Sequence, residues 1–174
     1  MLTALAESMA EHGYVGTSVA HIIRRAGVSR ETFYQQFASK QDCFAQGFDE
    51  LSGLLLQVAA RALPDKGTPV ERFAAVVDAY LNALADAPDL ARLYLVEVYA
   101  AGPEMARRRT ELQQAFVDGL TVTLRARSRQ DRFACEVLVA GITSLVTGRL
   151  VTGTPDDVRA LRAPLAALAA RIFA

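Results

Sequence analysis

The sequence has few of the residues that form metal sites, disulfide frameworks or membrane spans. It contains two cysteines, two histidines and no tryptophan. Cys43 and Cys135 lie too far apart along the chain for a zinc-ligand spacing, and a single pair is not a disulfide framework. A polar or charged side chain interrupts the longest apolar stretches, at Gln57, Asn82, Glu97 and Arg171. We therefore expect no metal, no membrane span and no membrane partner.

The sequence also lacks a charge excess and the usual patterns of an active site. It has 19 basic and 19 acidic side chains, so the net charge does not indicate a nucleic-acid partner. It has no glycine-rich phosphate loop, no Glu-x-x-His pair and no nucleophile elbow after a strand. No basic and apolar leader opens the chain. We expect a cytoplasmic protein that is not an enzyme and has neither catalytic residues nor a cofactor.

Helical periodicity is present along the whole chain. With 52% hydrophobic and 22% charged residues, the composition is that of a folded globular protein. Apolar residues recur at spacings of three and four, and short breaks with glycine or proline separate the periodic stretches, so we predict an all-α protein of about nine helices. The expected helices lie near residues 1–12, 18–26, 29–37, 39–63, 68–85, 88–100, 104–128, 131–152 and 156–173.

The segment Thr17–Phe37 has the spacing of a helix-turn-helix, with two short helices around Gly27. Glycine can adopt the left-handed conformation that the corner needs, and Val28 can fill the angle between the helices. In such a unit the second helix presents its N-terminal turns to the major groove of DNA. Side chains that can form hydrogen bonds with base edges there are Arg30, Glu31, Thr32 and Gln35. Side chains placed near the phosphates are Ser18, Tyr34 and Lys40.

Two alternatives to this interpretation stay open. The corner could be a generic helical turn whose glycine, valine and aromatic residues only pack together. An acidic residue in the first turn of a helix also interacts favourably with the helix dipole, which would explain Glu31 without any contact to a base.

The run Thr17–Lys40, TSVAHIIRRAGVSRETFYQQFASK, resembles the signature of the TetR/AcrR family of bacterial transcriptional regulators, and Ala6–Tyr14 resembles that family's first helix. The resemblance implies a nine-helix homodimer, with a three-helix DNA-binding domain over residues 1–47. It implies a ligand-binding and dimerisation domain over residues 48–174. The implied function is that of a repressor that binds a palindromic operator in double-stranded DNA and is released by a small-molecule inducer.

The chain departs from the family pattern in two ways. Ile23 stands where the family usually has a small residue, which alters the packing of the two motif helices. Many members carry a basic arm before the first helix, whereas this chain begins inside that helix. Residues 1–50 hold four basic and six acidic side chains. Few counterions are then released on DNA binding, and we expect a shallow salt dependence.

Two C-terminal stretches have apolar stripes with helical spacing, as in helix–helix interfaces. Gly141, Ser144 and Gly148 would allow close approach of a second helix. Two such helices from each subunit would form a four-helix dimer interface. The alternative is that both stripes pack only in the chain's own core. The candidate interface residues are Phe133, Leu138, Ile142, Leu145, Leu161, Leu165 and Leu168.

Aromatic residues with polar tips interrupt the apolar stretches of the central region. A cavity lined by such residues suits a small apolar or aromatic ligand, and the candidate contacts are Tyr80, Tyr94, Glu97 and Phe116. A tyrosine at core spacing can equally be an ordinary core residue with its hydroxyl at the surface. A rival function for the whole chain is a dimeric helical sensor or interaction protein with little affinity for DNA.

Overall fold

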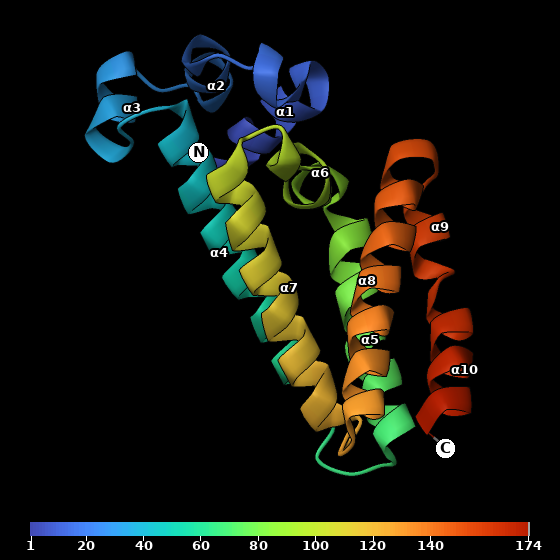
Figure 1. Cartoon of the computed structure of the whole chain (residues 1–174). Helices are drawn as coiled ribbons and strands as arrows, with labels where there is room; N and C mark the ends of the chain where they lie inside the picture. The colour runs from blue at the N-terminus through green and yellow to red at the C-terminus, as the bar shows by residue number, and fades with distance from the viewer. Residues whose placement is uncertain (174) are drawn as a thin grey trace. The chain divides into compact units, whose positions relative to one another are not determined.

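The computed structural model describes residues 1–173 and consists of helices joined by short connections (Figure 1). No strand occurs within these residues, which confirms the expected all-α class. The elements are α1 (Leu2–Gly16), α2 (Val19–Ala26), α3 (Arg30–Gln36), α4 (Lys40–Ala62), α5 (Pro69–Asp86), α6 (Pro88–Leu95), the 3-10 helix η1 (Glu97–Tyr99), α7 (Pro103–Thr123), α8 (Arg129–Thr152), α9 (Pro155–Arg159) and α10 (Arg162–Phe173).

Hydroxyl side chains start several of these helices. Ser18, Thr68, Ser128 and Thr154 each accept a hydrogen bond from the backbone N–H three residues later, and the side chain at that later position accepts from the cap residue's own N–H. This reciprocal arrangement pairs two N–H donors that a helix N-terminus otherwise leaves without a partner. The polar breaks in the sequence therefore mark the helix starts for a physical reason.

Four of the expected helices differ from those that the sequence predicts. The expected helix 88–100 ends at Leu95 as α6, and the 3-10 helix η1 follows it. Helix α1 continues past Gly13, which has φ 66° and ψ 170° and kinks the helix, to Gly16. Helix α7 ends at Thr123 and not near residue 128, because Arg125 adopts the left-handed conformation with φ 54°. The expected helix 156–173 is divided into α9 and α10. Pro164 lies in the first turn of α10, where its missing N–H costs no hydrogen bond.

The first of two compact units comprises residues 1–53 and 89–109. In it, α1 packs against α2 and η1, and α2 packs against α3. Figure 1 shows these helices gathered at the first turns of α4. Its largest fully buried side chains are Leu5, Met9, Ile22, Phe33, Phe44, Phe48, Leu93, Tyr94 and Leu95.

The second unit comprises residues 54–88 and the residues from Thr110 onward. Helix α5 packs against α9 and α10, which also contact α8 (Figure 1). Ion pairs of Arg159 with Asp86 and of Arg162 with Asp78 join α9 and α10 to α5.

The residues expected at a dimer interface fall into two groups. Leu138, Ile142, Leu161 and Leu165 are buried by the chain's own helices. For these four, the core alternative accounts for the apolar stripe. Phe133, Leu145 and Leu168 are 63%, 42% and 44% exposed, and Val137, Val151 and Ile172 are exposed beside them in sequence on the same two helices. Within the chain, α8 and α10 thus retain an uncovered apolar surface.

Among the described residues, α8 is long and apolar enough to cross a membrane by length and composition alone. The expectation that the chain has no such stretch missed this helix, because a single charge, Glu136, interrupts residues 133–148. One third of the residues in its most apolar 18-residue stretch are buried. The buried side packs against α9 and α10 as in a core helix, and the exposed side carries the apolar surface described above.

Candidate nucleic-acid interface

The first helix of the motif, α2, begins at a fully formed cap. The Ser18 hydroxyl accepts from the N–H of His21 at 3.2 Å, and Nδ1 of His21 accepts from the N–H of Ser18 at 3.4 Å. Ser18 is exposed. Ser18, which we expected near a phosphate, lies at the N-terminus of α2, where backbone N–H groups and the helix dipole favour an anion.

The corner between α2 and α3 depends on Gly27. This residue has φ 66° and ψ 29°, and the N–H of Val28 donates to the carbonyl of Ile23 at 3.1 Å. This hydrogen bond closes the end of α2 in the manner of a glycine C-cap. The predicted left-handed glycine is confirmed, and Val28 is half-buried at the corner.

Helix α3 has one buried face and one exposed face. Ser29 caps it by accepting from the N–H of Thr32 at 3.0 Å, and Phe33 is completely buried. The Phe33 and Phe37 rings lie 5.3 Å apart. The exposed side chains of the helix are Arg30, Glu31, Tyr34, Gln35 and Gln36. A short helix held by a single aromatic anchor therefore exposes a row of hydrogen-bonding groups.

Neighbouring side chains order part of this exposed face. The guanidinium of Arg30 lies over the Tyr34 ring, 5.5 Å from its centroid, and its Nη2 is 3.5 Å from the Tyr34 hydroxyl. The Thr32 and Ser29 hydroxyls are 2.9 Å apart. Arg30 and Tyr34 are four residues apart and so lie on the same side of the helix. Thr32 is half-buried and uses its hydroxyl within the cap.

Lys40, which we expected near a phosphate, makes its observed contacts inside the unit. Its Nζ donates to the carbonyls of Tyr14 and Thr17 at 2.7 and 2.8 Å, and it lies 4.3 Å from the centroid of the Tyr14 ring. Burial lowers the pKa of Lys40. Two of the three ammonium protons are thus used by the chain, and one is left for another acceptor.

Glu97, which we expected at a ligand site, instead binds the backbone of α1. Its Oε2 accepts from the N–H of Tyr14 at 2.7 Å. The buried Thr17 hydroxyl lies 2.7 Å from the carbonyl of Gly13 and 3.0 Å from that of Ser8. We call Gly13, Tyr14, Thr17, Lys40 and Glu97 the Tyr14 junction. The sequence did not predict the Tyr14 junction. Its one signal in the sequence was Gly13, a glycine inside a helical pattern.

The basic residues at the end of α2 do not all face outward for DNA. Arg25 pairs with Glu11 and lies 3.9 Å from Glu7, both on α1. The hydrogen bond from Arg25 is the largest cause of the lowered pKa of Glu11. Arg24 is exposed. The positive charge of Arg25 is therefore balanced within the unit.

The four residues expected to bind a ligand lie in two separate groups. Tyr80 and Phe116, in the second unit, make an edge-to-face contact with ring centroids 5.5 Å apart. Tyr94, in the first unit, is fully buried and stacks on Phe48 at 5.6 Å. Glu97 belongs to the Tyr14 junction. The contacts of Tyr94 are those of a core residue, but the residue is completely buried, whereas the alternative interpretation of the sequence placed the hydroxyl at the surface.

The second unit contains a pocket of about 370 Å³, which we call the α4–α7 pocket. Leu56, Ala60 and Leu63 of α4 line it, together with Val76 of α5 and with Phe116 and Leu120 of α7. Of the residues predicted to contact a ligand, Phe116 lines this pocket.

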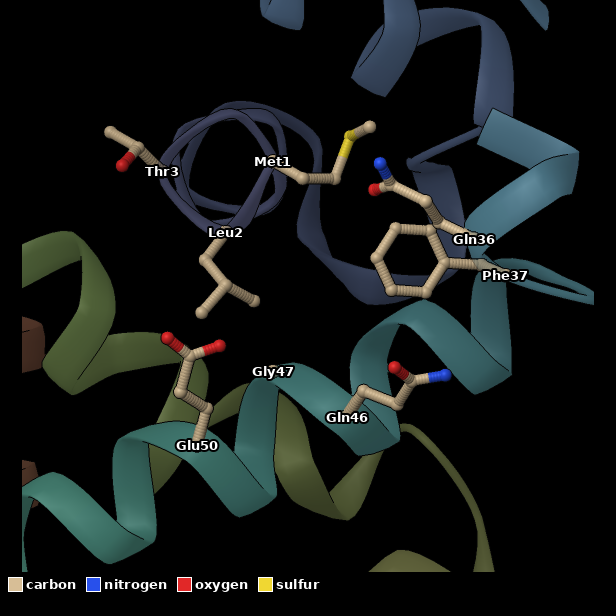
Figure 2. A pocket seen from close by; sticks show the side chains of 8 residues that line it. All are labelled: Met1, Leu2, Thr3, Gln36, Phe37, Gln46, Gly47 and Glu50. Carbon is tan, nitrogen blue, oxygen red and sulfur yellow. The ribbon is translucent and has the colours of Figure 1, made fainter. Parts of the chain in front are cut away.

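A second pocket of about 370 Å³ lies in the first unit, between the start of α1 and the face of α4 (Figure 2). Figure 2 shows the Leu2 side chain directed toward Gly47, with Gln36 and Phe37 on one side and Glu50 on the other. A Cβ at Gly47 would lie 2.5 Å from Leu2 Cδ2. The glycine thus allows α1 to approach α4 closely, which is a packing role.

Residues 1–46 match the sequence model of a family described as bacterial regulatory proteins, tetR family. The fatty acid metabolism regulator protein of Bacillus subtilis (strain 168) is 26% identical over 118 residues, which are 68% of this chain and 61% of that protein. The HTH-type transcriptional activator FasR of Mycolicibacterium smegmatis is 22% identical over 145 residues, 83% of this chain and 66% of that protein. The matches thus span about two thirds or less of these relatives, which are named as regulators and not as enzymes.

The fold is similar to that of solved regulators over almost the whole chain. The transcriptional regulator FadR from Bacillus subtilis, solved in complex with stearoyl-CoA, superposes with a TM-score of 0.83 at 23% identity, covering 97% of this chain and 95% of that one. The fatty acid degradation regulator FadR from Bacillus halodurans gives a TM-score of 0.82 at 23% identity, with the same coverage.

Proposed function

From the match of residues 1–46 to the model of the tetR family of bacterial regulatory proteins, we propose that the chain is a ligand-responsive transcriptional regulator of the cytoplasm that binds operator DNA as a homodimer. One observation carries the proposal. Helix α3 is anchored by the buried Phe33 and exposes a row of hydrogen-bonding side chains behind a glycine corner. That arrangement is what a recognition helix needs to enter the major groove.

In this proposal the exposed face of α3 reads base edges. Arg30 donates two parallel hydrogen bonds to a guanine, and Gln35 pairs with an adenine through its amide. Glu31 can accept from a cytosine. Each good pair contributes roughly 1–3 kcal/mol of discrimination against the wrong base.

Other groups hold the helix against the DNA backbone. The exposed Ser18 and the N–H groups at the start of α2 favour one phosphate, and the Tyr34 hydroxyl can donate to another. Lys40 contributes its remaining proton while its other two hold the carbonyls of Tyr14 and Thr17. Its contribution is therefore partly to keep α1, α2 and α4 in place.

A homodimer supplies the two recognition helices that a palindromic operator needs. Half-sites are read about 34 Å apart, and a two-fold axis relates the two helices. The uncovered apolar residues of α8 and α10, including Phe133, Leu145 and Leu168, form the self-complementary surface for this pairing. The wild-type protein then represses transcription when both helices fit the operator.

A small apolar ligand releases the repressor by favouring a dimer whose recognition helices are wrongly spaced. Such a shift needs only that the ligand binds one conformation better than the other. The α4–α7 pocket has apolar walls, and relatives are named for fatty acid metabolism. Long-chain acyl compounds are therefore the first ligands to test.

The test is operator binding by the full-length protein after selection of bound sequences from random duplexes. We expect a palindromic sequence. Tyr34→Ala and Lys40→Ala should weaken binding to all duplexes, whereas Gln35→Ala should also relax the preference at one base pair. Gln57→Ala, at an exposed glutamine on α4, is the matched control. Unchanged binding of the first three variants would refute the assignment.

A second candidate function is a dimeric helical sensor or interaction protein with little affinity for DNA. Two observations favour it: the six acidic side chains against four basic ones in residues 1–50, and the internal hydrogen bonds of Lys40. A selection at low salt that returns no palindromic sequence would support this second candidate.

A further inference from the structure

A contact on the exposed face of α3 joins the side chains of Arg30 and Tyr34. We propose that Tyr34 is a positioning residue for Arg30, and that its ring sets how strongly the protein prefers a guanine at the base pair that Arg30 contacts. This inference rests on the proposed DNA-binding function. It gives Tyr34 a role in specificity in addition to the general loss of affinity expected from its phosphate contact.

The Tyr34 ring lies where the guanidinium of Arg30 can rest on it. A helical side chain leans toward the N-terminus of its helix, so Tyr34 reaches back over the turn that begins at Arg30. The guanidinium lies over the ring, 5.5 Å from its centroid. A ring face attracts a cation within about 6 Å. The two side chains are therefore placed to attract each other before any DNA binds.

The Tyr34 ring is itself held by the buried side of the helix. The Phe33 ring makes an edge-to-face contact with it, with centroids 5.4 Å apart, and Phe33 is completely buried. The Phe37 ring lies 5.3 Å from that of Phe33. Tyr34 is 46% exposed, so part of its side chain packs and part faces solvent. A buried aromatic pair thus anchors the ring on which Arg30 rests.

The contact leaves the charge and most of the donors of Arg30 available. Among the described residues, no carboxylate pairs with Arg30, whereas Arg25 pairs with Glu11. A ring face attracts the charge of a guanidinium and needs no hydrogen-bond acceptor. One N–H group, at Nη2, is 3.5 Å from the Tyr34 hydroxyl, near the outer limit for a hydrogen bond. Two donors for the O6 and N7 acceptors of a guanine therefore remain.

Ordering of Arg30 before binding favours the base that accepts its paired hydrogen bonds. An arginine side chain loses much rotamer freedom when it is fixed on a base. Part of that loss has already occurred when the guanidinium rests on a ring, so less is lost on binding. A base that cannot accept both hydrogen bonds gains little from this ordering. An exposed contact between a cation and a ring is strong enough to change the guanine preference by about two- to fivefold.

The roles of the ring and of the hydroxyl of Tyr34 can be separated by substitution. Tyr34→Phe keeps the ring, so it should weaken binding to all duplexes and keep the guanine preference. Tyr34→Leu removes both groups, so it should also lower the preference by about two- to fivefold. Tyr99→Leu, at a 62% exposed tyrosine of η1, is the matched control and should change neither quantity.

The test is a double-mutant cycle of the full chain on the palindromic duplex that the selection returns. Arg30→Ala first identifies the base pair at which Arg30 prefers guanine. Fluorescence anisotropy titrations then give the preference, which is the ratio of the dissociation constant with adenine at this pair to that with guanine. Tyr34→Leu should lower this ratio in the wild-type background and leave it unchanged in the Arg30→Ala background.

A second measurement needs no DNA. The ring current of Tyr34 should shift the Arg30 side-chain protons upfield in NMR spectra of the wild type and of Tyr34→Phe, but not of Tyr34→Leu. Thermal melts check that every variant folds.

The inference is overturned if the upfield shift is absent, if Arg30→Ala changes no base preference, or if Tyr34→Leu keeps or raises the ratio. Palindromic binding with an unchanged ratio in Tyr34→Leu would overturn only the positioning role of Tyr34. A selection that returns no palindromic sequence would refute the regulatory proposal and this inference together.

Discussion

At the scale of single residues, the most informative group is the Tyr14 junction. The peptide of Tyr14 is held at both ends, since its N–H donates to Glu97 and its carbonyl accepts from Lys40. Both partners are charged, and hydrogen bonds to charged groups contribute more than neutral ones. The kink of α1 at Gly13, and with it the entry to α2, depends on side chains distant in sequence.

Glu97→Ala should therefore destabilise the protein by about 1–3 kcal/mol, because it leaves the N–H of Tyr14 without its partner. Glu97→Gln should destabilise the protein less, since its amide oxygen can still accept the hydrogen bond from the N–H of Tyr14. Denaturant unfolding measures both. Glu104→Ala removes only ion pairs at the surface and should change stability by less than about 1 kcal/mol. If Glu97→Ala and Glu104→Ala lowered the free energy of unfolding by the same amount, the proposed role of Glu97 would be contradicted.

Carboxylates that cap helices make the stability of the protein depend on pH. The pKa values of Asp42, Glu71, Asp131 and Asp157 are all lowered, with backbone hydrogen bonds as the largest cause. A lowered folded-state pKa stabilises the protein above the unfolded-state value, about 4, and that contribution is lost as the pH falls through the folded-state pKa. We expect the melting temperature to fall below about pH 4, and to fall less steeply in Asp131→Asn.

Sequence reasoning at this scale identified residue types and not their partners. Spacing places Phe33 and Phe37 on one face of a helix, so their burial could be predicted. The bonds of Glu97 with Tyr14 and of Lys40 with Tyr14 and Thr17 join residues 83, 26 and 23 positions apart. No local pattern encodes such pairs, and the sequence predicted instead that Lys40 lies near a DNA phosphate and Glu97 at a ligand site.

At the scale of elements, the glycine corner sets the angle at which α3 leaves α2. A Cβ at Gly27 would meet nothing within 4 Å, so the conformation and not a lack of space requires glycine. The helix starts were predictable because caps are local. The separation of α9 from α10 was not, because both share one apolar periodicity and Pro164 is compatible with a first turn.

Gly27→Ala should destabilise the protein by about 1–2 kcal/mol through left-handed strain, and should weaken operator binding because it changes the presentation of α3. Gly53→Ala is the matched control, since it lies inside α4 with open space around it. There alanine should stabilise by about 0.5–1 kcal/mol. If Gly27→Ala and Gly53→Ala changed the free energy of unfolding in the same direction, left-handed strain at Gly27 would not explain the effect.

At the scale of the whole molecule, the exposed apolar face of α8 needs another surface to cover it. Its exposed apolar residues, among them Phe133, Val137 and Leu145, would be costly in water if the chain remained single. The sequence predicted the apolar stripes. It could not divide them into core and surface, because both faces carry the same residue types.

Val137→Glu and Leu145→Glu should each weaken self-association by about 30-fold or more, since a buried charge without a partner is strongly unfavourable at an interface. Sedimentation velocity over a concentration series measures this. Leu54→Glu places the same charge on an exposed apolar position of α4 and should leave the dimer intact. A wild-type protein that sediments as a monomer at all concentrations would exclude the homodimer.

The Tyr14 junction also bears on how such regulators can be recombined. Glu97 comes from a segment beyond α4, so a hybrid that takes residues 1–53 from this chain and the remainder from a relative would lose the acceptor for the N–H of Tyr14. A functional hybrid therefore has to take residues 89–109 from this chain together with residues 1–53. The smallest exchangeable piece of this chain is therefore discontinuous in sequence.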